Sequence, residues 1–410
     1  MTGLIAAAGF ILTALLLPFF AYLGLVALAA ILGRRRPVAE IPPPSPLLAI
    51  VVPAHDEEAG IASTVASCLA SEYPPDRFRV HVIADNCGDA TAARAREAGA
   101  VVFERSDPDR RSKGYALETY FESTAAPWAG AGYDAAIIID ADSTIDPGLL
   151  RACAVALASG CDWAQAYYTV RNPDASWRTR LMTYAFALFN GVLPMGQDRL
   201  GLGVGLKGNG MMFSARGLAR FPWKAYGLVE DAEFALMLKA AGERVRFLDD
   251  ARVYGEMVST GDRAVGQRRR WEAGRRALRG RFFAPLARSP RLTLGRKTFY
   301  LVDLCMPSLL SMAAGLGLSS LIHPLAWFWP ELSRASAMLA PWHAAMGISL
   351  VMYATAPFRA LGLPLNYLKI LVYLPWYAVW KVARVGRRPP GGWERTRREP
   401  SAAPGGSVPS

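Results

Sequence analysis

Cysteine and histidine are scarce in this chain. Its 410 residues include only five cysteines and four histidines. The number of cysteines is odd, and no two of them have the C-x-x-C spacing that is typical of zinc or redox sites. Reduced thiols fit this pattern best, which favours a reducing compartment. His81, His323 and His343 have no clustered partners in the sequence, and His55 is best interpreted as structural.

Charge is missing from the N-terminal 33 residues. A run of this length exceeds the ~20 residues that one membrane span needs. A cleaved signal peptide usually carries positive charge before its apolar core, and this run carries none. We therefore expect residues 1–33 to form a retained transmembrane anchor, and the proline-rich stretch 34–46 to form a stiff linker.

Apolar residues make up 52% of the chain and gather at its two ends. Further membrane segments are expected at roughly 298–322, 336–357 and 364–385. The first contains Asp303 and Pro307, so it could instead lie along the membrane surface. If the middle of the chain and its basic tail are both cytoplasmic, the C-terminal region crosses an even number of times, and one of the three segments does not span.

Positive charge exceeds negative charge by 12. The arginines at 34–36 and 387–388 flank apolar runs, which is typical of the cytoplasmic side of a membrane and of contact with anionic lipids, so nucleic-acid binding is not favoured. The expected units after the linker are an α/β domain over 47–262, a basic interfacial region over 263–295, C-terminal transmembrane or interfacial helices over 296–386 and a disordered tail over 387–410.

The middle of the chain alternates between two patterns. Short β-rich runs occur at Leu48–Val52, Val80–Ala84, Ala100–Phe103 and Ala135–Ile139. Alanine-rich stretches with helical spacing lie between them, for example at Ile61–Ser71 and Ala90–Ala98. Strands that alternate with helices predict a mainly parallel sheet, with ligands at the carboxyl ends of its strands.

Two carboxylates, Asp140 and Asp142, directly follow the strand expected at 135–139. Carboxylate oxygens suit Mg²⁺ or Mn²⁺ that is bound together with phosphates. When a D-x-D pattern stands alone, a solvated turn is the more common explanation.

Three further polar fragments give this pattern a context. The first two strands end in polar clusters at Pro53–Glu58 and Asp85–Asp89, and Lys113 opens an expected helix where it could meet phosphate. In this order the fragments resemble the family 2 glycosyltransferases of the GT-A fold, over roughly residues 47–275. The resemblance implies a Rossmann-like, mainly parallel sheet and a nucleotide-sugar donor.

The resemblance also implies residue roles at the donor. Ala54, Glu57 and Asp85 would hold the nucleoside of a UDP-sugar, and Lys113 would approach its diphosphate. The chain departs from the family at Asp56, where the family commonly has asparagine. The role of Asp56 is therefore open.

At the reaction centre, the resemblance implies that Asp140 binds the nucleotide sugar and that Asp142 coordinates the metal beside it. The metal would be Mg²⁺ or Mn²⁺. The glycine-rich turn Gly208, Asn209 and Gly210 would lie beside the acceptor, because such a turn lets a bulky substrate approach the backbone closely.

An acidic stretch at Leu228–Glu233 resembles the Glu-Asp motif of the family. Asp231 would then be the general base that removes the proton of the acceptor hydroxyl, with Glu230 beside it in the catalytic set. The alternative is that Glu230, Asp231 and Glu233 only complement the dipole of a helix.

The stretch Gln267–Trp271 matches Q-x-x-R-W in full. It resembles the membrane-bound branch of the family, which includes cellulose, chitin and hyaluronan synthases, and ceramide glucosyltransferases carry a related version. Arg270 would neutralise the departing diphosphate, Trp271 would stack against the acceptor, and Gln267 would help to close the site. A basic amphipathic helix on the membrane surface is an alternative that can hold at the same time. Further arginines available for lipid contact are Arg268, Arg269, Arg275, Arg276, Arg279 and Arg281.

These patterns lead to one expected function with two alternatives. We expect an inverting transferase that extends a β-linked polysaccharide at the cytoplasmic face of the inner or plasma membrane. The protein would cross the membrane several times, and its partners would be membrane lipids and export proteins. Transfer of a single sugar to a lipid, such as a ceramide, diacylglycerol or polyprenyl phosphate, is the first alternative. An inactive scaffold of a secretion complex is the second.

Overall fold

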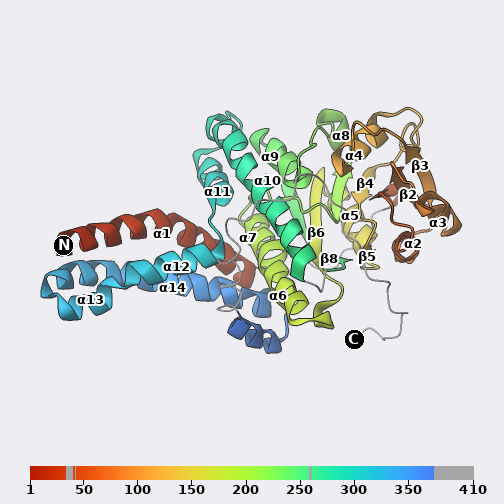
Figure 1. The fold of residues 1–410 in the computed structure, drawn as a ribbon. Helices are drawn as coiled ribbons and strands as arrows, with labels where there is room; N and C mark the ends of the chain where they lie inside the picture. The colour runs from red at the N-terminus through yellow and green to blue at the C-terminus, as the bar shows by residue number, and fades with distance from the viewer. Residues whose placement is uncertain (34–39, 42, 258–260, 374–410) are drawn as a thin grey trace.

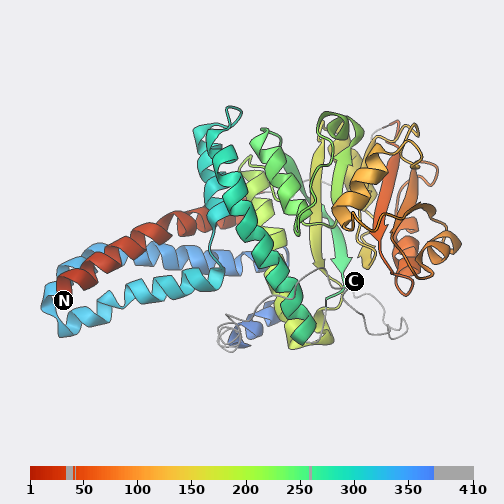
Figure 2. The same cartoon turned by 45° about the horizontal axis from the view of Figure 1, so that its top comes forward.

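The computed structural model describes residues 1–33, 40–41, 43–257 and 261–373, with the backbone alone for 261–272 and 371 (Figures 1 and 2). Its centre is an eight-stranded sheet in the order β3-β2-β1-β4-β7-β6-β8-β5. The strands are β1 Leu48–Ala54, β2 Phe78–Asp85, β3 Val101–Arg105, β4 Ala135–Ile138, β5 Ser143–Ile145, β6 Trp163–Val170, β7 Met211–Ser214 and β8 Val245–Gly255.

The sheet is mainly parallel, as the sequence predicts. Strands β3, β2, β1 and β4 run parallel, with Val51 of β1 opposite His81 of β2 and Ile138 of β4. Strand β7 is antiparallel to both β4 and β6, and β6 is parallel to β8. Because β1, β2, β4 and β6 point the same way, their carboxyl ends meet at one edge of the sheet.

Helices cover both faces of the sheet, which explains why its central strands are apolar throughout. Leu48 and Ile50 of β1 pack into one core with α2, α3 and α5, while Val51 packs into the other with α4 and α9. The helices of this part are α2 Ile61–Leu69, α3 Thr91–Glu97, α4 Lys113–Glu122, α5 Leu149–Ala158, η1 Pro173–Ala175, α6 Trp177–Phe186, the π-helical η2 Ala187–Val192, α7 Leu193–Arg199, α8 Ala215–Arg220 and α9 Glu230–Ala240.

Helix α1 (Thr2–Leu32) serves two environments. Its first half exposes apolar side chains such as Leu4 and Ile11, at 78% and 61%. Its second half is buried in the same core as β1, with Phe20 and Val26 fully covered. The backbone of α7 approaches it so closely that a Cβ at Gly196 would lie 2.1 Å from the Val26 carbonyl oxygen. The predicted anchor is therefore also part of the globular core.

Within the described part of the chain, three helical segments are long and apolar enough to cross a membrane: Thr2–Leu32, Leu309–Phe328 and Pro330–Ala360, with mean hydropathies of 2.5, 1.5 and 1.3. The last two comprise α12 Leu309–Ser320, α13 Ile322–Phe328, η3 Pro330–Leu332 and α14 Ser333–Ala360, and they project from the sheet together with α1 (Figure 1). Two candidate spans after the sheet fit the even number expected from the sequence, while the topology itself stays a prediction.

The C-terminal segments differ from those expected at 298–322 and 364–385. The chain breaks between α11 (Leu294–Cys305) and α12, because Pro307 has no N–H to continue a helix. Helix α11 packs against the globular part, where Asp303 accepts hydrogen bonds from Tyr22 and Lys239. Residues 365–373 form the 3₁₀ helix η4 (Leu365–Tyr373), and the rest of that segment lies outside the described residues.

His323 and His343 contact each other, contrary to the expectation from the sequence, and His81 contacts the hydroxyl groups of Tyr120 and Tyr133. Nε2 of His323 lies 2.9 Å from Nδ1 of His343, whose Nε2 lies 2.9 Å from the Thr13 hydroxyl. Ser336 continues the chain of contacts at 2.8 Å from Nδ1 of His323. Sequence spacing could not reveal this pairing because it depends on how α13, α14 and α1 pack. Polar contacts of this kind hold membrane helices together.

Candidate active site

The candidate site lies at the edge where the parallel strands end. Ala54 is the last residue of β1 and Asp85 the last residue of β2. Asp140 and Asp142 lie just beyond the end of β4. Each of these residues was predicted to face the donor, and the sheet topology brings them to a common edge.

Asp85 is held by a buried arginine. Nη1 of Arg105, at the end of β3, donates to Oδ1 of Asp85 at 2.5 Å, and the two side chains are only 4% and 10% exposed. Asn86 donates to the same oxygen, while Nη2 of Arg105 also pairs with Asp107. Among the described side chains no donor reaches Oδ2 of Asp85, so this oxygen can accept a hydrogen bond from a ligand.

The loop after β1 is tied to the loop after β2. Oδ1 of Asp56 accepts a hydrogen bond from the Gly88 backbone at 2.7 Å, and the Glu57 backbone donates to Thr91 at 2.7 Å. Asp56, Cys87 and Asp89 also form a group whose potential ligand atoms lie within 4.8 Å of one another. Backbone N–H groups donate hydrogen bonds to the carboxylates of both Asp56 and Asp89. The unusual Asp56 therefore has a structural role in joining the two loops.

Lys113 connects the end of β4 to the glycine-rich turn. It begins α4, and its ammonium group pairs with Oδ1 of Asp140 and donates to the Gly208 carbonyl oxygen at 2.5 Å. Oδ2 of Asp231 lies 3.4 Å from the place where a Cβ on Gly208 would be. The predicted donor lysine, the first aspartate and the predicted base therefore surround one turn.

The turn itself has a constrained backbone. Gly208 and Gly210 have backbone φ angles of 80° and 72°, a conformation that residues other than glycine rarely adopt. Asn209 is fully buried; its side chain donates to Ser143 at 2.7 Å and accepts from the Asp140 backbone at 3.2 Å. Both groups of the Asn209 side chain are thus engaged within the protein, where they fix the position of Asp140.

The carboxylates of the site are crowded. Burial, together with the charge of Asp231, raises the pKa of Glu230 to about 7. Burial also raises the pKa of Asp231. For Asp140, burial and the charge of Asp142 raise the pKa even though Lys113 opposes them. Burial, with repulsion from neighbouring carboxylates at Asp140 and Glu230, therefore disfavours the charged forms, and a bound cation or proton would relieve this cost.

The pKa of Lys113 is raised as well, which favours its charged form. Burial acts to lower the pKa of Lys113, but the charges of Asp140, Glu230 and Asp231 outweigh it and raise that pKa. Lys207, in the same glycine-rich stretch, has its pKa lowered by burial. The charged form is thus favoured for Lys113 and disfavoured for Lys207.

Helix α10 (Gly261–Arg288) carries the Q-x-x-R-W stretch past the site. Gln267, Arg270 and Trp271 lie on it, but their side chains are outside the described ones. Farther along, Arg281 pairs with Glu233 of α9, and Arg279 donates to the carbonyl oxygens at the end of α11. Of the arginines considered for lipid contact, Arg281 therefore holds α10 against α9, the helix that bears Asp231, and Arg279 holds it against α11.

Two residues of the site were not foreseen in these positions. Arg105 gave no signal beyond its place at the end of a strand. Tyr168 belongs to the buried strand β6; burial and the charges of Asp140 and Asp142 raise its pKa, so it lies near these carboxylates. The strand order that makes both residues part of the site is not visible in the sequence.

Two known proteins are similar to this chain in sequence. The β-monoglucosyldiacylglycerol synthase of Synechocystis sp. is 27% identical over 62% of this chain and 55% of its own length. An N-acetylglucosaminyltransferase of Rhizobium meliloti is 26% identical over 60% of this chain and 59% of its own length. The chain thus spans little more than half the length of these relatives.

A solved structure gives the fold. The mannosyltransferase from Pyrobaculum calidifontis, in complex with GDP-Man and Mn²⁺, superimposes with a TM-score of 0.55 at 17% identity. The match covers 88% of this chain and all of that one. It confirms the predicted GT-A architecture of a mixed, mainly parallel sheet with added membrane-type helices.

The family model described as "Glycosyltransferase like family 2" matches residues 43–274, which is more than half of the sequence and includes every predicted site residue. The chain therefore belongs to glycosyltransferase family 2.

Proposed function

We propose that this protein is an inverting glycosyltransferase that moves one sugar from a UDP-sugar to a membrane lipid. The observation that carries the proposal is the shared turn at Gly208, which Lys113, Asp140 and Asp231 surround. A donor diphosphate beside Lys113 and an acceptor hydroxyl beside Asp231 would then meet within one pocket.

Asp231 is the proposed general base. The acceptor oxygen attacks the anomeric carbon, the bond from that carbon to the diphosphate breaks, and the hydroxyl proton passes to the Asp231 carboxylate. A single displacement inverts the configuration, so an α-linked donor gives a β-linked product. The raised pKa of Asp231 suits this role, since it brings the carboxylate closer to a proton acceptor that works near neutral pH.

The donor set fits a divalent cation. Asp142 and Asp140 would hold Mg²⁺ or Mn²⁺, because these ions prefer carboxylate oxygens together with phosphates. Burial and the nearby charge of Asp142, which raise the pKa of Asp140, support this assignment, because a bound cation would stabilise the charged carboxylate. The ion would offset the charge of the departing diphosphate.

The remaining residues bind and orient the two substrates. Ala54, Glu57 and Asp85 would hold the nucleoside, with Oδ2 of Asp85 accepting from the base. The backbone of Gly208 and Gly210 would approach the acceptor, while Asn209 would position Asp140. Gln267 would help to close the site over the substrates; Arg270 and Trp271 would serve the leaving diphosphate and the acceptor as the family resemblance implies.

A lipid acceptor is favoured by the membrane-type helices. Only three candidate spans occur in residues 1–33 and 261–373, and they pack on one another around the Thr13–His343 contact. A polysaccharide channel usually needs more helices. The name of the Synechocystis relative, a diacylglycerol glucosyltransferase, points to the same acceptor class.

Extension of a polysaccharide is the second candidate, and the full Q-x-x-R-W match at Gln267–Trp271 favours it. In this proposal the catalytic part would lie at the cytoplasmic face of the inner or plasma membrane, and a glycan, a lipid and export components would be its partners. An inactive scaffold is disfavoured, because the acidic and basic positions of the family are all present.

The test is transfer of radiolabel from UDP-sugars in the presence of Mn²⁺, with diacylglycerol, ceramide and polyprenyl phosphate as acceptors. We expect label in the organic phase as a product with one added sugar in β-linkage. Label that stays in an aqueous polymer would show that the acceptor is a polysaccharide and not a lipid. No transfer from any donor would contradict the activity as a whole, and Asp231→Asn gives the background.

A further inference from the structure

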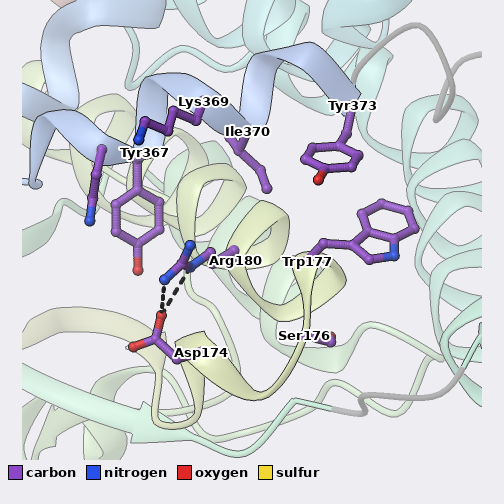
Figure 3. A pocket seen from close by; sticks show the side chains of 9 residues that line it. Asp174, Ser176, Trp177, Arg180, Tyr367, Lys369, Ile370 and Tyr373 are labelled. Carbon is purple, nitrogen blue, oxygen red and sulfur yellow. Dashed lines mark hydrogen bonds and ion pairs between the residues drawn. The ribbon is translucent and has the colours of Figure 1, made fainter.

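A second pocket, of about 410 Å³, lies between the start of α6 and η4 (Figure 3). It shares no lining residue with the candidate active site. Four of its lining residues come from the stretch that begins α6, and five come from η4. They are Asp174, Ser176, Trp177, Arg180, Asn366, Tyr367, Lys369, Ile370 and Tyr373.

Aromatic rings and charges line different parts of this pocket. The rings of Trp177 and Tyr373 stack with their centres 5.6 Å apart and their planes 14° apart. Arg180 donates to Oδ1 of Asp174 through two nitrogens, at 2.9 and 2.7 Å, so much of its charge is balanced (Figure 3). Lys369 is exposed and has no acidic partner among the described residues.

The outer side of η4 is apolar. Leu365, Leu368 and Val372 are 68%, 41% and 78% exposed, whereas Ile370 on the inner side is 4% exposed. This segment begins only a few residues after α14, the last candidate span. An apolar outer side at the end of a membrane helix fits a segment that lies in the boundary between lipid and water.

We propose that this pocket binds the phosphate of an anionic phospholipid headgroup, with Lys369 as its main charge partner. Lysine and arginine side chains at the membrane surface attract the phosphates of anionic lipids, and each lysine in this position strengthens lipid binding measurably. Arg178, whose guanidinium lies 4.7 Å from the centre of the Trp177 ring, adds positive charge beside the pocket. The site is independent of the proposed sugar transfer.

Phospholipid binding can be measured on the full chain after removal of native lipid in detergent. Native mass spectrometry would follow the binding of phosphatidylglycerol and of phosphatidylcholine. We expect one phosphatidylglycerol to bind about tenfold tighter than phosphatidylcholine, and Lys369→Glu to weaken it at least about fivefold. Lys369→Gln should have a smaller effect in the same direction.

A matched control is Arg334→Glu, which reverses an exposed charge in the first turn of α14, at the opposite end of that helix. It should leave the tight phosphatidylglycerol in place. Equal binding of both lipids, no effect of Lys369→Glu, or an equal loss in the Arg334→Glu protein would overturn the proposal. Displacement of the lipid by millimolar inorganic phosphate would show that free phosphate is the ligand instead.

Discussion

The carboxylates at the two ends of the site differ in how they are neutralised. Asp85, at the end of β2, has a buried arginine within 2.5 Å. Asp140, Glu230 and Asp231 lie at the other end, where burial raises the pKa of each and repulsion from neighbouring carboxylates adds to this for Asp140 and Glu230. The charge of Asp85 is balanced by an arginine, whereas the charged forms of the second group are disfavoured even though Lys113 is close to them.

This difference separates binding from chemistry. A neutral nucleobase needs only a fixed hydrogen-bond acceptor, and the ion pair of Asp85 with Arg105 keeps that acceptor in place. A reaction that moves a proton and expels a diphosphate needs groups whose charge can change or be offset. Crowded carboxylates supply both, at a cost in stability that proteins commonly accept at functional sites.

Loss of the base should have the largest effect. Asp231→Asn removes the proton acceptor but keeps the shape of the side chain, so turnover should fall by about 10²–10⁴-fold while UDP affinity stays nearly unchanged. Transfer kinetics and UDP binding by calorimetry would measure the two quantities. Glu97→Gln, which changes an exposed carboxylate on α3, is the control and should keep full activity. Normal turnover in the Asp231→Asn protein would remove Asp231 from the mechanism.

The balanced region should lose stability when its carboxylate is neutralised. Asp85→Asn leaves Arg105 buried with Asp107 as its remaining acidic partner, so the free energy of unfolding should fall by about 3 kcal/mol. Denaturant unfolding in detergent would measure it. Glu104→Gln on β3, the strand of Arg105, breaks an exposed pair with Arg96 and should change that free energy by less than about 1 kcal/mol. Equal effects of both substitutions would mean that Asp85 is not specially held.

In the region of Asp140, Glu230 and Asp231, neutralising a carboxylate should raise the stability of the protein, whereas neutralising Asp85 should lower it. The pKa of Glu230 is about 7 in the folded protein and near 4.5 ordinarily, so the folded form binds more protons between these values. Stability without metal should therefore decrease as pH rises from about 4.5 to about 7. Glu230→Gln should remove this decrease and stabilise the metal-free protein by about 3 kcal/mol at pH 8, with little change at pH 4. Thermal unfolding across this range would show it, and destabilisation at pH 8 would contradict it.

The sequence predicts the local parts of the site well. Asp85 and Asp140 were placed at strand ends because apolar β-rich runs stop just before them, and the structure has those ends. Contacts between distant segments were beyond its reach. Arg105 becomes a partner of Asp85 only because β3 is the neighbour of β2, and α1 enters the core only because α7 offers it Gly196.

The most direct test is Mn²⁺ binding followed by electron paramagnetic resonance, with and without UDP. The account predicts one Mn²⁺ per chain that binds more tightly with UDP, and at least a tenfold loss of affinity in Asp142→Asn. Asp89→Asn, in the group of Asp56, Cys87 and Asp89, should leave this affinity unchanged. Mn²⁺ binding that is lost in the Asp89 variant and kept in the Asp142 variant would contradict the account.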